Sequence, residues 1–190
     1  GTRYTWTIQI DNQDITGQTA QNVAQSTFIQ TLKNETNTPQ FIVYTLTPIS
    51  GTCAGTPFDL TVQVNPTPEI TTKNTSICSE ETFTISPTNT AVNGIGDIVP
   101  TGTTYSWTVV DNPLVTGETD QPNFQVNISQ TLTNTTNQVQ TVQYTVTTKS
   151  GTTGNCIGQT FLVNVLVNPN PFIKPATETV CSGSPFTIPQ

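Results

Sequence analysis

Apolar side chains alternate with polar ones along several short stretches of the chain. Tyr105, Trp107 and Val109 are separated by Ser106 and Thr108, so one face of an extended segment is apolar and the other polar. This period of two is typical of a β-strand with one buried face. The same alternation recurs at Tyr4, Trp6 and Ile8, at Phe83 and Ile85, at Phe124, Val126 and Ile128, at Val142, Tyr144 and Val146, and at Phe161, Val163, Val165 and Val167.

These strands predict an all-β fold with an aromatic core. Turn-forming clusters separate the strands at intervals of about ten to fifteen residues, as in an immunoglobulin-like Greek-key sandwich of two sheets. Thr, which suits strands, is abundant, whereas the good helix formers Ala, Leu, Glu and Lys are scarce. We expect the core to contain Tyr4, Trp6, Tyr44, Tyr105, Trp107 and Tyr144.

The chain repeats itself with a period of about one hundred residues. The sequence GTRYTWTI at Gly1 returns as GTTYSWTV at Gly102, which places Trp6 and Trp107 101 residues apart. Later motifs recur at intervals of 100 to 103, and these include Gln30-Thr31-Leu32, Ser50-Gly51-Thr52 and Ile77-Cys78-Ser79. Small loop insertions explain the drift in spacing.

Two proline-rich stretches, residues 65–68 and 168–171, give the phase of the repeat. Both read Asn-Pro-x-Pro, which favours a short, extended and stiff linker. With the boundaries placed there, residues 69–171 form a complete module, residues 1–68 form a module that lacks its first strands, and residues 172–190 begin a third. We expect these modules to be arranged end to end, as part of a longer array.

The four cysteines predict disulfides, because the chain has no His and no Cys-x-x-Cys pair that would favour a metal site. Disulfides would in turn indicate an oxidising, extracellular setting. We favour a bridge between Cys78 and Cys156 within the complete module, with the partners of Cys53 and Cys181 outside the fragment. The alternative, Cys53 with Cys78 and Cys156 with Cys181, spaces both pairs equally and would connect adjacent modules.

Charge and residue types exclude several classes of function. The formal net charge is −7, which opposes binding to nucleic acid, and no apolar run is long enough to cross a membrane. Without His, most catalytic schemes lack their usual base, and we expect no enzymatic activity and no cofactor. The carboxylates at Glu80-Glu81 and at Glu118 and Asp120 fit solvated loops better than an acid/base pair.

Calcium is a weaker alternative for one group of loop residues. Oxygen-bearing side chains gather in the loops that flank the strand of Trp107, but they show no known calcium-binding spacing and fit ordinary turn chemistry better. These residues are Asp97, Asp111, Asn112, Glu118 and Asp120.

The ordered series of motifs YSWTVV, QTLTNTT, YTVTTKSGT, FLVNVLVNPNP and VCSGSPFTI resembles the PKD-like repeat modules of very large Bacteroidetes surface proteins. It is most similar to the modules of SprB-type gliding-motility adhesins. The resemblance implies repeated PKD-like sandwiches, type IX secretion, display on the outer membrane, and attachment to surfaces during gliding. The chain lacks the aspartate-rich turn of common PKD domains, since Trp107 is followed by Thr-Val-Val-Asp-Asn.

On this basis the segment is expected to act as a spacer and a weak multivalent binder at the cell surface. Its partners would be an extracellular surface or polysaccharide and the neighbouring repeats, while other parts of the protein would engage the motility and secretion machinery. The alternative is an accessory module, serving as linker or carbohydrate-binding unit, of a secreted multidomain hydrolase.

Overall fold

Two separate hydrophobic cores organise the chain in the computed structural model, which describes all residues except 93, 152–153, 173–174, 176 and 188–190. One core draws on residues between Tyr4 and Val64, and the other on residues between Ile70 and Val167. We call the two parts the N-terminal unit and the C-terminal unit. The described residues contain sixteen strands, and they include no helix that is long and apolar enough to span a membrane.

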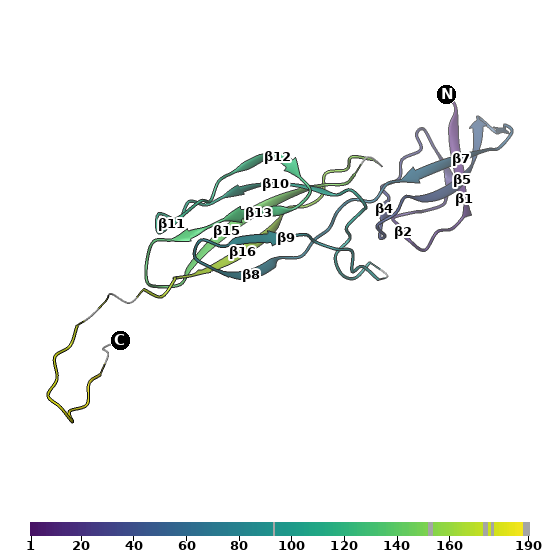
Figure 1. The fold of residues 1–190 in the computed structure, drawn as a ribbon. Coiled ribbons are helices and arrows are strands. Elements are labelled where there is room, and N and C mark those ends of the chain that lie inside the picture. The colour runs from purple at the N-terminus through teal and green to yellow at the C-terminus, as the bar shows by residue number, and fades with distance from the viewer. Residues whose placement is uncertain (93, 152–153, 173–174, 176, 188–190) are drawn as a thin grey trace.

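The C-terminal unit is a two-layer sandwich (Figure 1). Its main sheet has the strand order β12-β10-β15-β16-β8, and the pairs β9–β13 and β11–β14 form the facing layer. This arrangement confirms the predicted all-β, immunoglobulin-like fold. The strands of the unit are β8 (Lys73–Cys78), β9 (Thr82–Ile85), β10 (Thr104–Val109), β11 (Val115–Thr116), β12 (Gln121–Gln125), β13 (Ile128–Thr131), β14 (Thr133–Asn134), β15 (Gln140–Lys149) and β16 (Phe161–Asn168).

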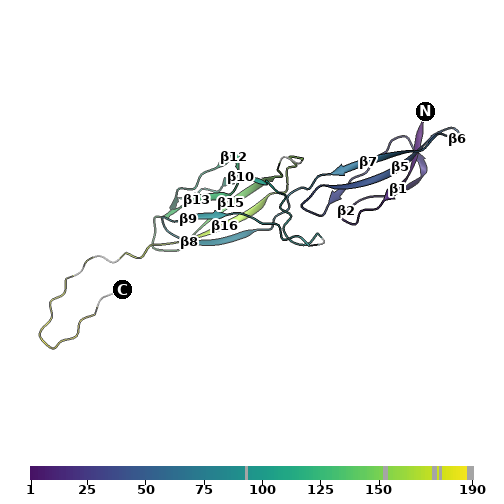
Figure 2. The same cartoon turned by 45° about the vertical axis from the view of Figure 1, so that its right-hand side comes forward.

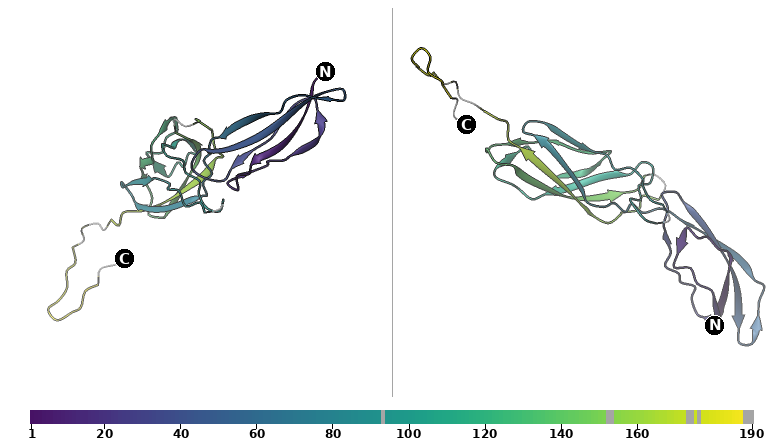
Figure 3. Two further views of the ribbon diagram at one scale, coloured as in Figure 1. Left: turned by 90° about the vertical axis from the view of Figure 1, so that its right-hand side faces the viewer. Right: turned by 90° about the horizontal axis from the view of Figure 1, so that it is seen from below.

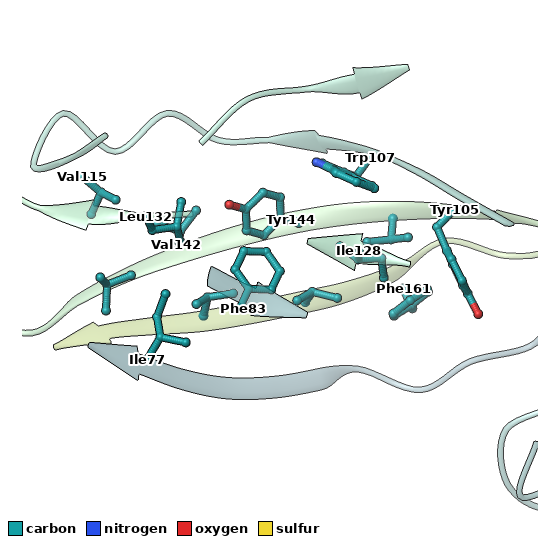
Figure 4. Close-up of a cluster of buried hydrophobic side chains, with 14 of the residues drawn as sticks. Ile77, Phe83, Tyr105, Trp107, Val115, Ile128, Leu132, Val142, Tyr144 and Phe161 are labelled. Carbon is teal, nitrogen blue, oxygen red and sulfur yellow. The ribbon is translucent and has the colours of Figure 1, made fainter. Parts of the chain in front are cut away.

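Aromatic side chains fill the space between these layers (Figure 4). Tyr144 is fully buried on β15, and its ring centroid lies 5.4 Å from that of Phe83 on β9. Two of the aromatic residues also form hydrogen bonds: the Tyr144 hydroxyl donates to Gln130 Oε1 (2.9 Å), and Trp107 Nε1 donates to the carbonyl of Thr119 (3.1 Å). The core is therefore anchored by hydrogen bonds as well as by packing.

A parallel strand closes the edge of the main sheet. β8 runs beside β16 in register from Lys73 opposite Val163 to Cys78 opposite Asn168. Asn168 Nδ2 also donates to the hydroxyl of Ser76 (2.8 Å), which adds a side-chain contact to the ladder. With β8 in place, the inward-facing residues of β16 are almost fully buried: Phe161, Val163, Val165 and Val167.

The N-terminal unit repeats much of this plan (Figure 2). β5 pairs with β1, β6 and β7, and β3 pairs with β1, while β2 pairs with β4. Trp6 and Tyr44 are buried, Tyr4 is half-buried against the core, and Trp6 Nε1 donates to the carbonyl of Thr19 (2.9 Å). The strands are β1 (Arg3–Ile10), β2 (Ile15–Thr16), β3 (Gln21–Gln25), β4 (Lys33–Asn34), β5 (Gln40–Ser50), β6 (Cys53–Ala54) and β7 (Phe58–Val64).

A buried asparagine occupies the same turn in both units. Asn134 Nδ2 donates to the carbonyls of Gln138 (2.7 Å) and Val167 (2.8 Å), and its Oδ1 accepts from the backbone and hydroxyl of Thr136. Asn34 makes the equivalent bonds in the N-terminal unit. The amide thus ties the turn before β5 or β15 to the end of the last strand of its unit.

One predicted strand is interrupted. The alternation at Phe124, Val126 and Ile128 suggested a single strand with one buried face, but β12 ends at Gln125 and β13 begins at Ile128. Phe124 and Val126 are exposed, and Ile128 alone is buried. The reason is that the chain passes from one layer to the other here, so the two halves of the alternating stretch belong to different sheets.

Replacing Trp107 tests the packing of the C-terminal unit. Trp107→Ala should lower the free energy of unfolding by about 3–5 kcal/mol, because it removes a large buried side chain and leaves a cavity. Thr108→Ala, at the adjacent exposed position, should change it by no more than about 0.5 kcal/mol. Denaturant unfolding followed by circular dichroism measures both values, and equal effects would contradict the assignment of Trp107 to the core.

Candidate functional site

Several carboxylates that the sequence analysis considered for acid/base chemistry or calcium binding accept hydrogen bonds from the backbone. Glu81 Oε2 accepts from the backbone N–H of Cys78 (2.9 Å), Glu118 Oε1 from that of Asn112 (3.2 Å), and Asp120 Oδ1 from that of Val109 (2.8 Å). Within the described residues, no three His, Cys, Asp or Glu side chains gather closely enough to hold a metal ion. These carboxylates therefore act as hydrogen-bond acceptors that stabilise the local backbone.

Among the described residues, Asp97 is a buried carboxylate with a dense set of partners. Its Oδ1 accepts from the backbone N–H (2.9 Å) and hydroxyl (2.8 Å) of Thr71, and Oδ2 pairs with the ammonium of Lys73. Its own backbone N–H donates to the hydroxyl of Thr90 (2.9 Å). Asp97 thus holds the residues that lead into β8 against the loop between β9 and β10.

These contacts shift the ionisation of Asp97 and of a neighbour. Burial by itself would raise the pKa of Asp97, but the hydrogen bonds from Lys73 and Thr71 outweigh burial and lower the pKa below its usual value. Burial and, to a smaller extent, the negative charge of Asp97 raise the pKa of Tyr105 to about 12. Asp97 is therefore ionised at neutral pH and forms an ion pair with the partly exposed Lys73.

The predicted bridge between Cys78 and Cys156 is not formed, and all four cysteines are unbonded in the structure. Cys156 lies in the β15–β16 hairpin, where its carbonyl accepts from the N–H of Ser150 (2.9 Å). Cys78 is the last residue of β8, beside Asn168 at the far end of β16.

The failed pairing has a simple geometric cause. The prediction placed Cys78 at the beginning of its strand, near the hairpin, but the strand begins at Lys73 and carries Cys78 to the opposite end. The eight residues of β16 alone span about 23 Å, whereas a disulfide needs Cα atoms within about 7 Å. The alternative pairs, Cys53 with Cys78 and Cys156 with Cys181, are not formed either.

Charged residues meet where the two units approach each other. Lys33 Nζ lies 3.0 Å from Glu35 Oε2 and 3.2 Å from Glu69 Oε2, and the hydrogen bond to Glu35, followed by that to Glu69, raises the pKa of Lys33. The Lys33 and Glu69 side chains are more than half exposed, and such surface pairs contribute only about 0–1 kcal/mol each. Ion pairing alone therefore holds the junction weakly.

Close backbone packing contributes more to the shape of the junction. Pro66 and Pro68 of the linker are buried. A Cβ on Gly154 would lie 2.7 Å from the Cβ of Asn65, and a Cβ on Gly158 would lie 2.2 Å from the carbonyl oxygen of Pro68. The β15–β16 hairpin can therefore pack against the end of the N-terminal unit only because glycine stands at these two positions.

A polar hollow of about 680 Å³ lies at the same junction. It is lined mainly by Asp14, Lys33 and Glu35 of the N-terminal unit and by Ala91 and Gly94 of the C-terminal unit. Two of its charged side chains, Lys33 and Glu35, already pair with each other. The junction is thus an interface between repeats that also forms a shallow polar surface.

The chain matches a known family of domains over most of its length. The family of PKD-like domains matches residues 1–68 and 75–171. A search of curated proteins gives no match.

The Asp97 ion pair predicts an acid-sensitive stability. Because the pKa of Asp97 is lowered by folding, its contribution is present above the unfolded pKa of about 3.9 and is lost as the pH falls through the lower folded value. Asp97→Asn should reduce the free energy of unfolding at pH 7 by about 1.5–3 kcal/mol, the range for hydrogen bonds to charged groups. It should also flatten the loss of stability between about pH 5 and pH 2.

Urea unfolding at a series of pH values measures both effects. Asp111→Asn is the matched control, because Asp111 is exposed and should leave the pH profile unchanged. Parallel profiles for the wild type and Asp97→Asn would contradict a charged, hydrogen-bonded Asp97 in the folded protein.

Proposed function

The chain belongs to the PKD-like domain family, and we propose that it is a repeat segment of a large cell-surface adhesin. Members of this family are generally non-catalytic immunoglobulin-like modules. Its role is to extend the protein away from the cell and to offer many weak contacts to a substratum during gliding. The family supports the coarser function of an extracellular spacer or binding module. The repeated motifs suggest the more specific role of a gliding adhesin.

The observation that carries the proposal is the repetition of one sandwich across a buried two-proline linker. The two cores contain corresponding residues, such as Trp6 and Trp107 or Tyr44 and Tyr144. β15 has ten residues and therefore extends about 30 Å, so each added unit lengthens the protein by at least that distance if units are joined end to end. A repeat of this kind adds reach with every copy.

The surface composition favours weak contacts over one strong site. The chain carries few charged residues, and its exposed positions are rich in Thr, Asn and Gln, which supply hydroxyl and amide groups. Contacts of this kind to a polysaccharide or a mineral surface are individually weak, but repetition raises the effective concentration of each further contact. Export by the type IX route and attachment to the outer membrane belong to the same proposal.

Surface labelling of intact cells tests the location. Antibodies against the 190-residue chain should label unpermeabilised cells of the source organism, and the label should move along the cell during gliding. If the antibodies detect the protein only in the culture medium, the result would favour the alternative, an accessory module of a secreted hydrolase. Label that requires permeabilisation would contradict both.

Bead binding tests the adhesive role separately. Beads coated with the chain should adhere to glass or polysaccharide more strongly as the coating density rises, since the contacts are multivalent. The control is an unrelated immunoglobulin-like domain of similar net charge at the same density. If both kinds of bead adhere equally, the chain acts as a spacer and the proposed binding function is excluded.

A further inference from the structure

Hydroxyl groups cluster on the outer face of the main sheet in the N-terminal unit. Thr5 lies opposite Thr47, and Thr7 lies opposite Thr45, in the antiparallel pair of β1 and β5. Trp6, which stands between Thr5 and Thr7, is buried, so the four threonines point away from the core. Neighbouring strands lie about 4.8 Å apart and alternate residues about 6.8 Å apart, so these side chains form a compact lattice. We call them the N-terminal quartet.

The N-terminal quartet lines a hollow of about 400 Å³. The hollow forms where β3 bulges beside β1: Tyr4 pairs with Gln25 and Trp6 with Gln21, so a step of two residues on β1 faces a step of four on β3. The extra residues of β3 leave the ladder and make room beside the sheet. Gln21 and Asn22 also line the hollow, which adds amide groups to the hydroxyls.

Most of these hydroxyls have no partner within the protein. Thr45 donates to Asp59 Oδ1 (2.8 Å), but within the described residues the side chains of Thr5, Thr7 and Thr47 form no hydrogen bond to another protein group. Their hydroxyls therefore face water and are available to a ligand. Threonine is stiff about χ1, so a ligand that binds these hydroxyls orders the side chains at little cost in conformational entropy.

The same pattern returns on the C-terminal unit. Thr108 lies opposite Thr145, and Ser106 lies opposite Thr147, at positions that correspond to the N-terminal quartet. We call these four residues the C-terminal quartet. β12 bulges beside β10 in the same way as β3 beside β1. Figure 3 shows that each unit keeps its own set of strands, so the chain carries two such faces.

Other outward-facing positions of the two sheets differ between the units. Phe41 on β5 corresponds to Thr141 on β15, and Asp59 on β7 corresponds to Leu162 on β16. An aromatic, a charged and an aliphatic side chain are thus all tolerated on these faces. Because the sheet accepts such different residues at its surface, the return of four hydroxyls at the same places favours a role in binding over a role in folding.

Charge decides which class of ligand fits the quartets. Neither quartet contains an ionisable side chain, and the charges of Arg3 and Asp59, which border the N-terminal quartet along the strands, balance each other. The net charge of −7 opposes an anionic polymer or a negatively charged glass surface. Each hydroxyl both donates and accepts hydrogen bonds, as the hydroxyls of an uncharged sugar chain do. The faces therefore fit a neutral polysaccharide.

We propose that the two quartets are the surfaces through which this chain binds a neutral polysaccharide. The inference rests on the proposed adhesive function and deepens it, because it names the binding surface and the class of ligand. Each quartet alone binds weakly, since a hydroxyl exchanges a hydrogen bond with water for one with sugar. Two quartets on each chain, and more in an array, raise the strength of attachment through multivalency.

Affinity electrophoresis of the full chain tests the proposal. In native gels that contain dextran, laminarin or galactomannan, the wild type should be retarded by at least one polymer, and about 0.5 M salt should not abolish the effect. The test variant removes six hydroxyls and should bind at least tenfold more weakly, since each hydrogen bond contributes about two- to tenfold in affinity. Its substitutions are Thr5→Val, Thr7→Val, Thr47→Val, Thr108→Val, Thr145→Val and Thr147→Val.

A matched control variant carries valine at six exposed threonines outside the strands of the main sheets. It should be retarded like the wild type, and both variants should unfold at the wild-type temperature because all the sites lie on the surface. The control substitutions are Thr31→Val, Thr72→Val, Thr88→Val, Thr101→Val, Thr116→Val and Thr160→Val.

Four results would overturn the proposal: no retardation of the wild type by any of the three polymers, retardation by anionic alginate alone, equal retardation of the wild type and the test variant, or equal loss in the test and control variants. Bead adhesion measured in parallel separates this inference from the proposed function. If beads coated with the test variant adhere as strongly as wild-type beads, the adhesive function stands and the quartets are not its binding surfaces.

Discussion

The structure depends on one strand pairing, the parallel contact between β8 and β16. With β8 in place, the main sheet of the C-terminal unit has a covered edge, and Val163, Val165 and Val167 are shielded from water. The turn after β8 then brings β9 to β13, so the same segment supplies a strand to each layer. Within the part of the chain that the structure describes, the N-terminal unit has the same inner strands but leaves β7 paired on one side and residues 28–31 without a ladder. The two units of one chain thus show what the pairing contributes.

The pairing also links the fold to the proposed function. Asp97 fixes the residues that lead into β8, and the linker before them packs against the β15–β16 hairpin through Gly154 and Gly158. The segment that completes one sandwich is therefore continuous with the joint to its neighbour, which favours a stiff spacer. Cys78 and Cys156 lie at opposite ends of this unit, so a disulfide partner of either must come from outside the unit.

Much of the fold could be predicted from the sequence, because the signals were local. Alternation around Trp107, Tyr144 and Val165 reports one buried face directly, and the repeat extends the result to the N-terminal unit. Features that depend on long-range pairing were harder to predict. The break between β12 and β13 arises from a change of layer, and the position of Cys78 depends on where β8 begins. Asn34, Asn134 and Asp97 gave only weak signals, because Asn and Asp are common in turns. The two asparagines recur at the same place in each repeat, and that recurrence is the signal that could have identified them.

Native-state hydrogen exchange measures the central claim most directly. Backbone amides throughout β16 should be strongly protected, since strands pair on both its sides. In β7, the amides directed away from β5 should exchange orders of magnitude faster than their counterparts in β16. Similar protection of both strands would contradict the account, because it would mean that the edge of β7 is already covered.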